Sequence, residues 1–308
     1  MRVLVLGGCG FIGSHVVDQL VANNHDVRVL ARRPEAARPP VPGVEYVWGD
    51  LRDAAQVSQA VVGCDSVVHL VSATTSASGD RDPQFDVEQN LLTTLSLLDV
   101  LAKADVRRLV YLSSGGTVYG PTTVVPTSET HPLRPIGSYG IVKVAVEGYI
   151  QSFARTRGLK PIIIRPSNAY GERQGRNGAD GSVSVLLRRA LTGDPFEIWG
   201  DGSVVRDYLH VTDLARLCVL SAESSVTGIF NAGTGVGTSL RALVDLAAEV
   251  TGRKIQVRYA AARSVDAPVN ILDIGAARDA LGWSPEITLR KGLGRTWDWL
   301  LRHPPETD

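Results

Sequence analysis

The sequence predicts an α/β protein: a Rossmann-like, doubly wound parallel sheet with a smaller C-terminal α/β substrate domain. Short apolar runs, typical of parallel strands buried on both faces, alternate with segments of helical spacing over residues 3–165. A glycine-rich turn follows the first of these runs directly. The chain has 308 residues, which is long for a single core, so we expect one large domain and one smaller domain.

The first strand and its turn predict a dinucleotide site. Val3 to Leu6 is an apolar run, and it leads into Gly-Gly-Cys-Gly-Phe-Ile-Gly and then a helix over 14–23. Glycines let the backbone approach a pyrophosphate, and a helix N-terminus offers N–H groups and a positive dipole end. The residues expected to hold the cofactor here are Gly7, Gly10, Phe11, Ile12 and Gly13.

The second strand, 27–30, leaves the choice between NAD and NADP open. An NAD site usually has an acidic residue at this strand end, whereas an arginine suits the 2′-phosphate of NADP. The sequence has Ala31, Arg32 and Arg33 instead of a carboxylate. Arg32 is therefore a candidate cofactor residue, although both arginines could simply begin a solvated loop before Pro34.

The remaining strands place polar residues at the same sheet edge, where ligands of open α/β sheets bind. Asp50 follows a strand over 44–48 and could accept a hydrogen bond from an adenine amino group. A strand over 66–70 precedes a Ser/Thr-rich loop, and a strand over 108–112 delivers the stretch 113–120. Further expected elements are a long helix over 86–104, strands over 161–165 and 229–232, glycine-rich loops from 166, and helices over 240–250, 276–281 and 289–302. We predict a dinucleotide domain of residues 1–168 with about 207–232, and a substrate domain of about 169–206 and 233–308.

Tyr139 and Lys143 lie four residues apart, one turn from each other on a helix. A nearby positive charge favours the phenolate and lowers the tyrosine pKa from its usual value near 10. A phenolate available near neutral pH is a general base suited to a secondary alcohol. Alone, the pair could equally be an ordinary exposed Tyr/Lys pair.

Composition excludes several classes of partner. There are 32 basic and 32 acidic residues, which gives no hint of nucleic acid or an acidic membrane surface. The three cysteines lack metal-ligand spacing, so we expect no metal site and a reducing compartment. No apolar run approaches the roughly 18 residues that span a bilayer, and we expect a cytoplasmic protein.

Taken together, these motifs resemble the extended short-chain dehydrogenase/reductases, specifically the NAD-dependent epimerase/dehydratase family. The resemblance covers nearly the whole chain. It rests on Gly7–Gly13, Gly49–Leu51, Val68–Leu70, Ser113–Gly120, Ser138–Lys143, Arg165–Gly171, Trp199–Gly202, Arg206–Asp213, Arg263–Asp266 and Leu281–Pro285. Within the family, the chain is most similar to the UDP-glucose (UDP-galactose) 4-epimerases.

This resemblance implies inversion at the sugar C4 by transient oxidation to a 4-keto sugar. Tyr139 would take the O4 proton while hydride leaves C4 for NAD, and Lys143 would hold the nicotinamide ribose and depress the tyrosine pKa. Asn168, Arg206 and Arg263 match positions that bind the diphosphate of the nucleotide sugar, and two arginines suit a pyrophosphate. Leu51, Leu70 and Asn90 fall at cofactor positions. A homodimer through the helices near 86–104 and 138–157 is implied as well.

Three departures from the family pattern refine this expectation. The usual catalytic Ser or Thr is Gly115, so we assign the hydrogen bond to O4 to Thr117, with Ser114 as the second candidate. The acidic residues of the dehydratases and decarboxylases are absent at Gly116 and Thr117, which disfavours both reactions. Asn270 stands where a bulky tyrosine restricts relatives to glucose and galactose, so we expect N-acetylated hexosamines to be admitted too.

Two alternatives stay open at this point. An NADPH-dependent ketoreductase or epimerase of nucleotide deoxysugars would fit the arginines that follow Leu30. A non-catalytic dinucleotide-binding regulator is the other, with Gly115 slightly in its favour and the intact Tyr139 and Lys143 against it.

Overall fold

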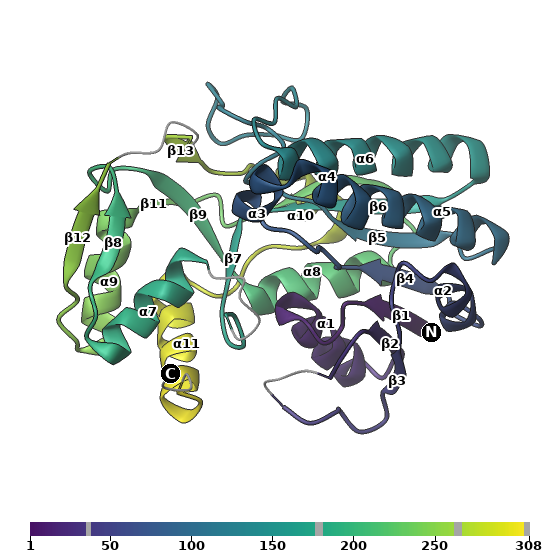
Figure 1. Cartoon of the computed structure of the whole chain (residues 1–308), viewed down its shortest axis with the longest axis horizontal. Coiled ribbons are helices and arrows are strands. Elements are labelled where there is room, and N and C mark those ends of the chain that lie inside the picture. Colours follow the sequence, from purple (N-terminus) through teal and green to yellow (C-terminus); the bar gives the residue numbers. More distant parts are fainter. Residues whose placement is uncertain (35–37, 176–180, 262–266, 305–308) are drawn as a thin grey trace.

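The main body of the protein is a seven-stranded sheet, seen in a computed structural model that describes residues 1–34, 38–175, 181–261 and 267–304 (Figure 1). Its strand order is β10-β6-β5-β4-β1-β2-β3, and every neighbouring pair is parallel. The strands are β1 (Arg2–Leu6), β2 (Asp26–Ala31), β3 (Glu45–Trp48), β4 (Ser66–His69), β5 (Arg108–Leu112), β6 (Lys160–Pro166) and β10 (Gly228–Ala232). The strand order reverses between β1 and β4, which is the point where open α/β sheets bind ligands.

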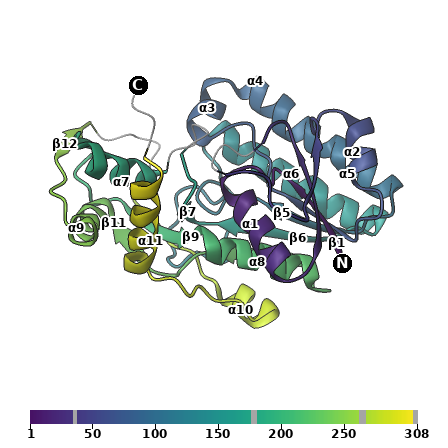
Figure 2. The same ribbon diagram turned by 90° about the horizontal axis from the view of Figure 1, so that it is seen from below.

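Helices cover both faces of this sheet (Figures 1 and 2). One face carries α1 (Phe11–Ala22), α8 (Val211–Glu223) and α10 (Gly275–Leu281), and the other carries α2 (Ala54–Ala60), α5 (Thr93–Lys103) and α6 (Ser138–Arg157). Strand β1 shows why both faces are apolar: Val3 and Val5 belong to the first apolar cluster, whereas Leu4 and Leu6 belong to the second. Successive side chains of a strand point to opposite faces of the sheet, so an unbroken apolar run indicates a strand that is buried on both faces. The predicted fold class is confirmed.

A smaller body lies at one end of the sheet and has its own apolar cluster (Figure 1). It contains α7 (Ser182–Thr192), α9 (Leu240–Thr251) and α11 (Leu289–Arg302), with β8 (Phe196–Trp199) paired to β12 (Val257–Ala260). A further sheet is centred on β9 (Val205–His210), which pairs with β7 (Asn168–Tyr170), β11 (Gly237–Ser239) and β13 (Val269–Asn270). Within segment 275–283, which the predicted division gives to the substrate domain, Ala277 and Trp283 pack into the first cluster of the main sheet.

Two segments differ from the sequence expectation. The stretch expected as glycine-rich loops contains β7–β9, α7 and α8, and most residues of α8 are buried. The single helix expected over 86–104 is a succession of α4 (Pro83–Asp86), the π-helical turn η1 (Val87–Leu92) and α5, preceded by α3 (Ser76–Arg81). Within the described residues, we find no helix long and apolar enough to cross a membrane.

Two buried histidines should make the fold sensitive to mild acid. Burial and the neighbouring Arg173 lower the pKa of His15 to about 3, and burial and Lys143 lower that of His69 to about 3. In the unfolded chain both titrate near the usual value of about 6.5, so between pH 6.5 and 3 the unfolded state binds more protons. The contribution of the two buried, uncharged histidines to the free energy of unfolding is therefore fully present above pH 6.5 and falls as the pH drops below it. We expect a loss of about 1–2 kcal/mol per histidine between pH 7 and 5 in urea unfolding.

A matched variant separates this effect from general acid sensitivity. His69→Gln removes one of the two buried titrating groups, so its free energy of unfolding should fall less steeply between pH 7 and 5 than that of the natural chain. A free energy of unfolding that stays flat from pH 7 to 5 would contradict the linkage.

Candidate active site

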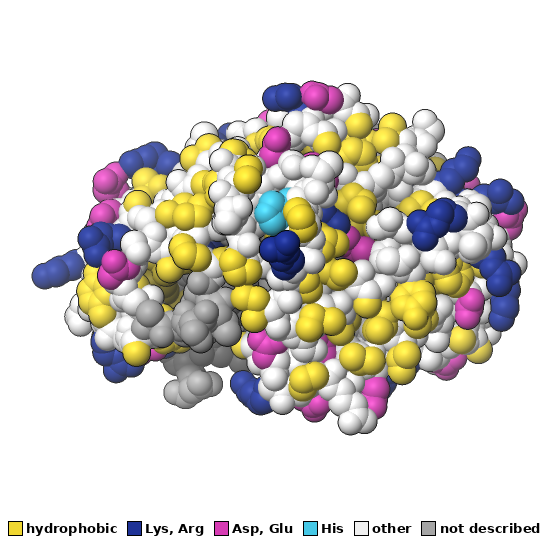
Figure 3. Space-filling view, turned by 90° about the horizontal axis from the view of Figure 1, so that it is seen from above, with side chains coloured by type: hydrophobic (Ala, Val, Ile, Leu, Met, Phe, Trp, Pro, Cys, Tyr) yellow, Lys and Arg dark blue, Asp and Glu magenta, His cyan; other side chains and the backbone are white. Residues whose placement is uncertain are grey.

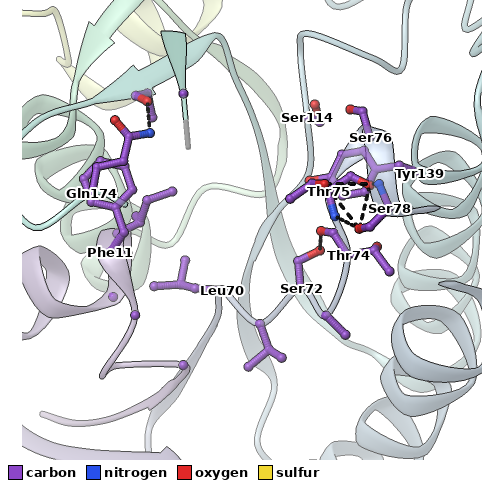
Figure 4. Close-up of a pocket in the computed structure, with 18 of the residues that line it drawn as sticks. Phe11, Leu70, Ser72, Thr74, Thr75, Ser76, Ser78, Ser114, Tyr139 and Gln174 are labelled. Atoms are coloured by element: carbon purple, nitrogen blue, oxygen red, sulfur yellow. Dashed lines mark hydrogen bonds between the residues drawn. The ribbon is translucent and has the colours of Figure 1, made fainter. Parts of the chain in front are cut away.

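A cleft of about 1110 Å³ runs between the carboxyl ends of the main sheet and the smaller body. On the sheet side it is lined by the turn after β1, the end of β2 and the loop after β4; on the far side by residues from β7, α7 and β9. Figure 4 shows Tyr139 and Ser114 near the Ser/Thr-rich loop, with Phe11 and Gln174 across the opening. The predicted site residues that line it are Gly7, Gly10, Phe11, Ile12, Gly13, Arg32, Asp50, Leu51, Leu70, Ser114, Thr117, Tyr139, Asn168 and Arg206.

The turn after β1 requires glycine for close backbone approach. Gly7 has a φ of +86°, and its N–H donates to the Leu30 carbonyl at 3.1 Å. A Cβ on Gly13 would overlap the Gly7 carbonyl oxygen. Helix α1 starts at Phe11 with Gly10 as N-cap and no side-chain cap, and both line the cleft. This uncapped helix start in a glycine cradle fits a dinucleotide pyrophosphate.

The end of β2 carries positive rather than negative charge. Arg32 and Arg33 line the cleft beside Ala31. Asp50, on the same wall, is paired with Arg52 through a contact of 2.6 Å, and hydrogen bonding to Arg52 lowers the pKa of its carboxyl. Asp50 is thus an anion whose oxygens already accept hydrogen bonds from Arg52.

Thr117 and Tyr139 are brought together by Gly140. A Cβ at Gly140 would lie 3.0 Å from the Thr117 carbonyl oxygen and 3.3 Å from the Thr117 Cβ, so a larger residue would separate the start of α6 from this loop. The Thr117 Oγ1 is buried and has no hydrogen-bond partner in the described structure. Because Thr117 lines the cleft, its hydroxyl is placed to form a hydrogen bond with a bound molecule.

The expected pKa of Tyr139 is wrong for the protein alone. Burial raises the pKa to about 12, a hydrogen bond with Ser72 lowers it, and the charge of Asp86 raises it. The Lys143 Nζ lies over the tyrosine ring, 5.5 Å from its centroid, and donates to the Leu112 carbonyl at 2.9 Å. Burial lowers the pKa of Lys143 to about 8, so its charge is itself weakened by the site. Lys143 does not line the cleft in the described structure.

Gly115 and Asn270 lie behind the cleft wall. A Cβ on Gly115 would sit 2.5 Å from Leu272 Cδ1 and 2.9 Å from the Arg165 carbonyl oxygen, so a side chain here would enter the packed interior. Asn270 is buried and donates to the Gly115 carbonyl at 3.1 Å, and it does not line the cleft. Its role beside a sugar C2 substituent stays a prediction, and its observed contact supports the loop that carries Thr117.

Gly115→Ser should therefore destabilise the fold without adding a catalytic hydroxyl. We expect a loss of about 1–3 kcal/mol, typical of overpacking, and no gain in turnover. The matched variant Gly116→Ser places its Cβ 3.9 Å from the nearest neighbouring atom, Ser114 Oγ. Its free energy of unfolding should therefore lie within about 0.5 kcal/mol of that of the natural chain. Urea unfolding of both variants measures this, and equal stability of the two would contradict the geometry.

Asn90 also lies off the cleft. Its Oδ1 accepts from the Ala73 N–H at 2.8 Å, and its Nδ2 donates to Thr74 and Asp86. These bonds hold the loop after β4, so the structure gives Asn90 a supporting contact and its cofactor role stays a prediction.

The opposite wall holds the predicted nucleotide-sugar contacts. Asn168 donates to the Asp207 carbonyl at 3.2 Å, and Arg206 donates to the Ala267 carbonyl at 2.7 Å. Arg263 lies outside the described residues. Sequence reasoning missed Ser167, whose buried Oγ has no partner in the described structure and which lines the cleft. Ser167 directly follows the carboxyl end of β6, and this position in the sequence could have indicated a ligand-binding residue. Ser72 and Arg173 also line the cleft, and the Ser/Thr-rich loop pointed to the former.

The fold and the cleft define a dinucleotide-dependent α/β enzyme with a Tyr/Lys pair. The model of the NAD dependent epimerase/dehydratase family matches residues 3–233, and the chain belongs to this family.

Its relatives are similar over their whole length. A putative UDP-glucose 4-epimerase of Methanocaldococcus jannaschii is 35% identical, with 97% of this chain and 98% of the relative covered. The crystal structure of Thermotoga maritima UDP-glucose 4-epimerase with UDP-glucose is 35% identical with a TM-score of 0.93 and coverage of 98% and 99%. The Thermus thermophilus UDP-glucose 4-epimerase with NAD is 34% identical (TM-score 0.90, coverage 98% and 99%). A UDP-N-acetylglucosamine 4-epimerase of Methanobrevibacter ruminantium, in complex with UDP-N-acetylmuramic acid, is 26% identical (TM-score 0.92, coverage 98% of each).

Proposed function

We propose that this protein is an NAD-dependent nucleotide-sugar 4-epimerase that interconverts UDP-hexoses. The observation that carries the proposal is that Tyr139 and Thr117 line one cleft together with the glycine cradle and Arg206. Relatives over the full chain are UDP-glucose 4-epimerases, and a structural neighbour is complexed with NAD.

Each residue has a definable task in this reaction. NAD, when bound, supplies the reversible hydride acceptor for C4. Tyr139 takes the proton from the sugar O4 and returns it, and Thr117 forms a hydrogen bond to the same oxygen. Ser114 is the second hydroxyl at this wall. Lys143 supplies a positive charge over the Tyr139 ring, and such a charge favours the phenolate. Asn168, Arg206 and Arg263 bind the diphosphate.

UDP-glucose and UDP-galactose are the primary pair of the proposed substrates, and we include the N-acetylated hexoses. The sequence basis for this extension is Asn270 in place of a bulky tyrosine, although its side chain lies behind the cleft wall in the described structure. The family neighbour that acts on UDP-N-acetylglucosamine supports this extension.

The test is an NMR assay of the purified protein with UDP-glucose and UDP-N-acetylglucosamine and no added cofactor. An axial C4 epimer should appear from each substrate, because a redox-neutral enzyme keeps its dinucleotide. No turnover without added NADPH would contradict the proposal.

That outcome would favour an NADP(H)-dependent ketoreductase or epimerase of nucleotide deoxysugars as the second candidate. The specific observation behind it is that Arg32 and Arg33 line the cleft where a carboxylate would hold the adenine ribose. The ketoreductase oxidises one NADPH for each carbonyl that it reduces, and an absorbance assay detects this consumption.

We further propose a cytoplasmic homodimer formed by α4–α6. Five exposed apolar side chains lie on α4, η1 and α6: Phe85, Val87, Leu92, Ile141 and Tyr149. Figure 3 shows that hydrophobic side chains are spread over the face seen from above in Figure 1. Removing such a surface from water is the usual driving force of homodimers. Size-exclusion chromatography with light scattering tests this, and an Ile141→Glu variant should run as a monomer.

A further inference from the structure

Asp86 is a fully buried carboxylate outside the residues assigned above, and it joins three separate segments. Its Oδ1 accepts from the Thr74 hydroxyl and from Asn90 Nδ2, both at 2.7 Å. Its Oδ2 accepts from the Ser138 hydroxyl at 2.8 Å. Thr74 lies in the loop after β4, Asn90 in the π-helical turn η1, and Ser138 is the first residue of α6. All three donors are neutral.

The segments that Asp86 joins are those that carry the reacting side chains. Ser138 directly precedes Tyr139, and Ser72, which forms a hydrogen bond with Tyr139, donates to the Thr74 carbonyl at 3.0 Å (Figure 4). Tyr139, Ser72 and Thr74 all line the cleft. A Cβ on Gly79 would lie 2.7 Å from Asp86 Oδ2, so α3 also closes against the carboxylate. The π-helical turn places Asn90 within reach of both Thr74 and Asp86, and such turns often occur at functional sites.

We propose that Asp86 is a positioning residue of the active site, whose carboxylate fixes the loop 72–75 against the first turn of α6 and so holds Tyr139 and Ser72 together. The inference rests on the proposed epimerase function. Asp86 does not line the cleft in the described structure, so it acts through Ser138 and Thr74.

Its charge also acts on the general base. The other titratable groups that face this site are Lys143 and Glu147 on α6, Asp80 on α3, Tyr111 on β5 and His69 on β4. Besides burial, the charge of Asp86 raises the pKa of Tyr139. Removing that charge should lower the pKa of Tyr139 and move the acid limb of the rate profile to lower pH.

Two variants separate position from charge. In Asp86→Asn the amide oxygen can accept from Thr74 and Asn90, and the amide nitrogen can donate to Ser138. We expect kcat within about threefold of the natural enzyme and an acid limb displaced to lower pH. Asp86→Ala removes all three acceptors, and kcat should fall about 10–100-fold with little change in the KM of the UDP-sugar.

Hydrogen–deuterium exchange of the protein without substrate completes the test. Exchange at residues 72–75 and 138–141 should rise in Asp86→Ala and stay low in Asp86→Asn. The exposed Asp245→Asn on α9 is the matched control and should change nothing. The proposal would be overturned if Asp86→Ala had the kcat and the hydrogen exchange of the natural protein. It would also be overturned if Asp86→Asn were as slow as Asp86→Ala and the acid limb of its rate profile did not move. If the natural protein fails to epimerise UDP-sugars, the proposed function fails, and the exchange comparison still decides whether Asp86 holds the two segments.

Discussion

Replacing Tyr139 by Phe should lower epimerisation by about 10²–10⁴-fold, the usual contribution of a general acid–base group. The phenolic oxygen is the only part removed, so the Cβ stays close to Gly79 and the ring stays under the Lys143 ammonium. Binding of the UDP-sugar should be retained, because Asn168 and Arg206 are untouched. Turnover of UDP-glucose by NMR and binding of UDP by calorimetry measure the two effects.

The control is Tyr259→Phe, which removes a hydroxyl from an exposed tyrosine on β12, away from the cleft. It should turn over at the natural rate. A Tyr139→Phe protein that keeps natural activity would show that Tyr139 is not the proton acceptor, and a regulator that only binds dinucleotide would then be the better interpretation.

The largest effect on stability is expected at a buried ion pair behind the active site. Arg165 and Glu147 are each 2% exposed, and their side chains meet at 2.6 Å and 3.1 Å in a two-point contact. The Ser113 hydroxyl donates to Glu147, and Arg165 donates to the Tyr119 hydroxyl at 3.0 Å. Glu147 lies one turn after Lys143, so this network supports both α6 and the loop that carries Thr117.

Glu147→Ala should destabilise the protein by about 3–5 kcal/mol, because it leaves the Arg165 guanidinium buried without its counter-ion. The double variant Glu147→Met/Arg165→Met removes both charges and should recover a large part of that loss. Urea unfolding at pH 7 measures both. This account would be contradicted if the free energy of unfolding of Glu147→Ala lay within about 1 kcal/mol of that of the natural chain. It would also be contradicted if the double variant were less stable than Glu147→Ala.

The sequence by itself determined the main sheet. The features that predicted it are local: short buried strands, the glycine turn at Gly7–Gly13 and the Tyr139/Lys143 spacing. Each is a pattern of four to seven residues that can be recognised in the sequence, because parallel strands and helix starts of this kind have the same residue requirements in every protein. The predicted cofactor residues from Gly7 to Leu70 accordingly all line the cleft.

Only the tertiary structure decided what faces the cleft and what stands behind it. Asn90, Lys143 and Asn270 carry polar groups at expected positions, yet each makes its contacts inside the protein. The pKa of Tyr139 likewise depends on burial, which outweighs the hydrogen bond with Ser72. Asp86 could not be found from spacing, since its three partners are separated by up to 64 positions, Thr74 to Ser138, and meet only when α6 packs beside η1. Side-chain direction and desolvation are properties of the packed structure, and a linear pattern does not encode them locally.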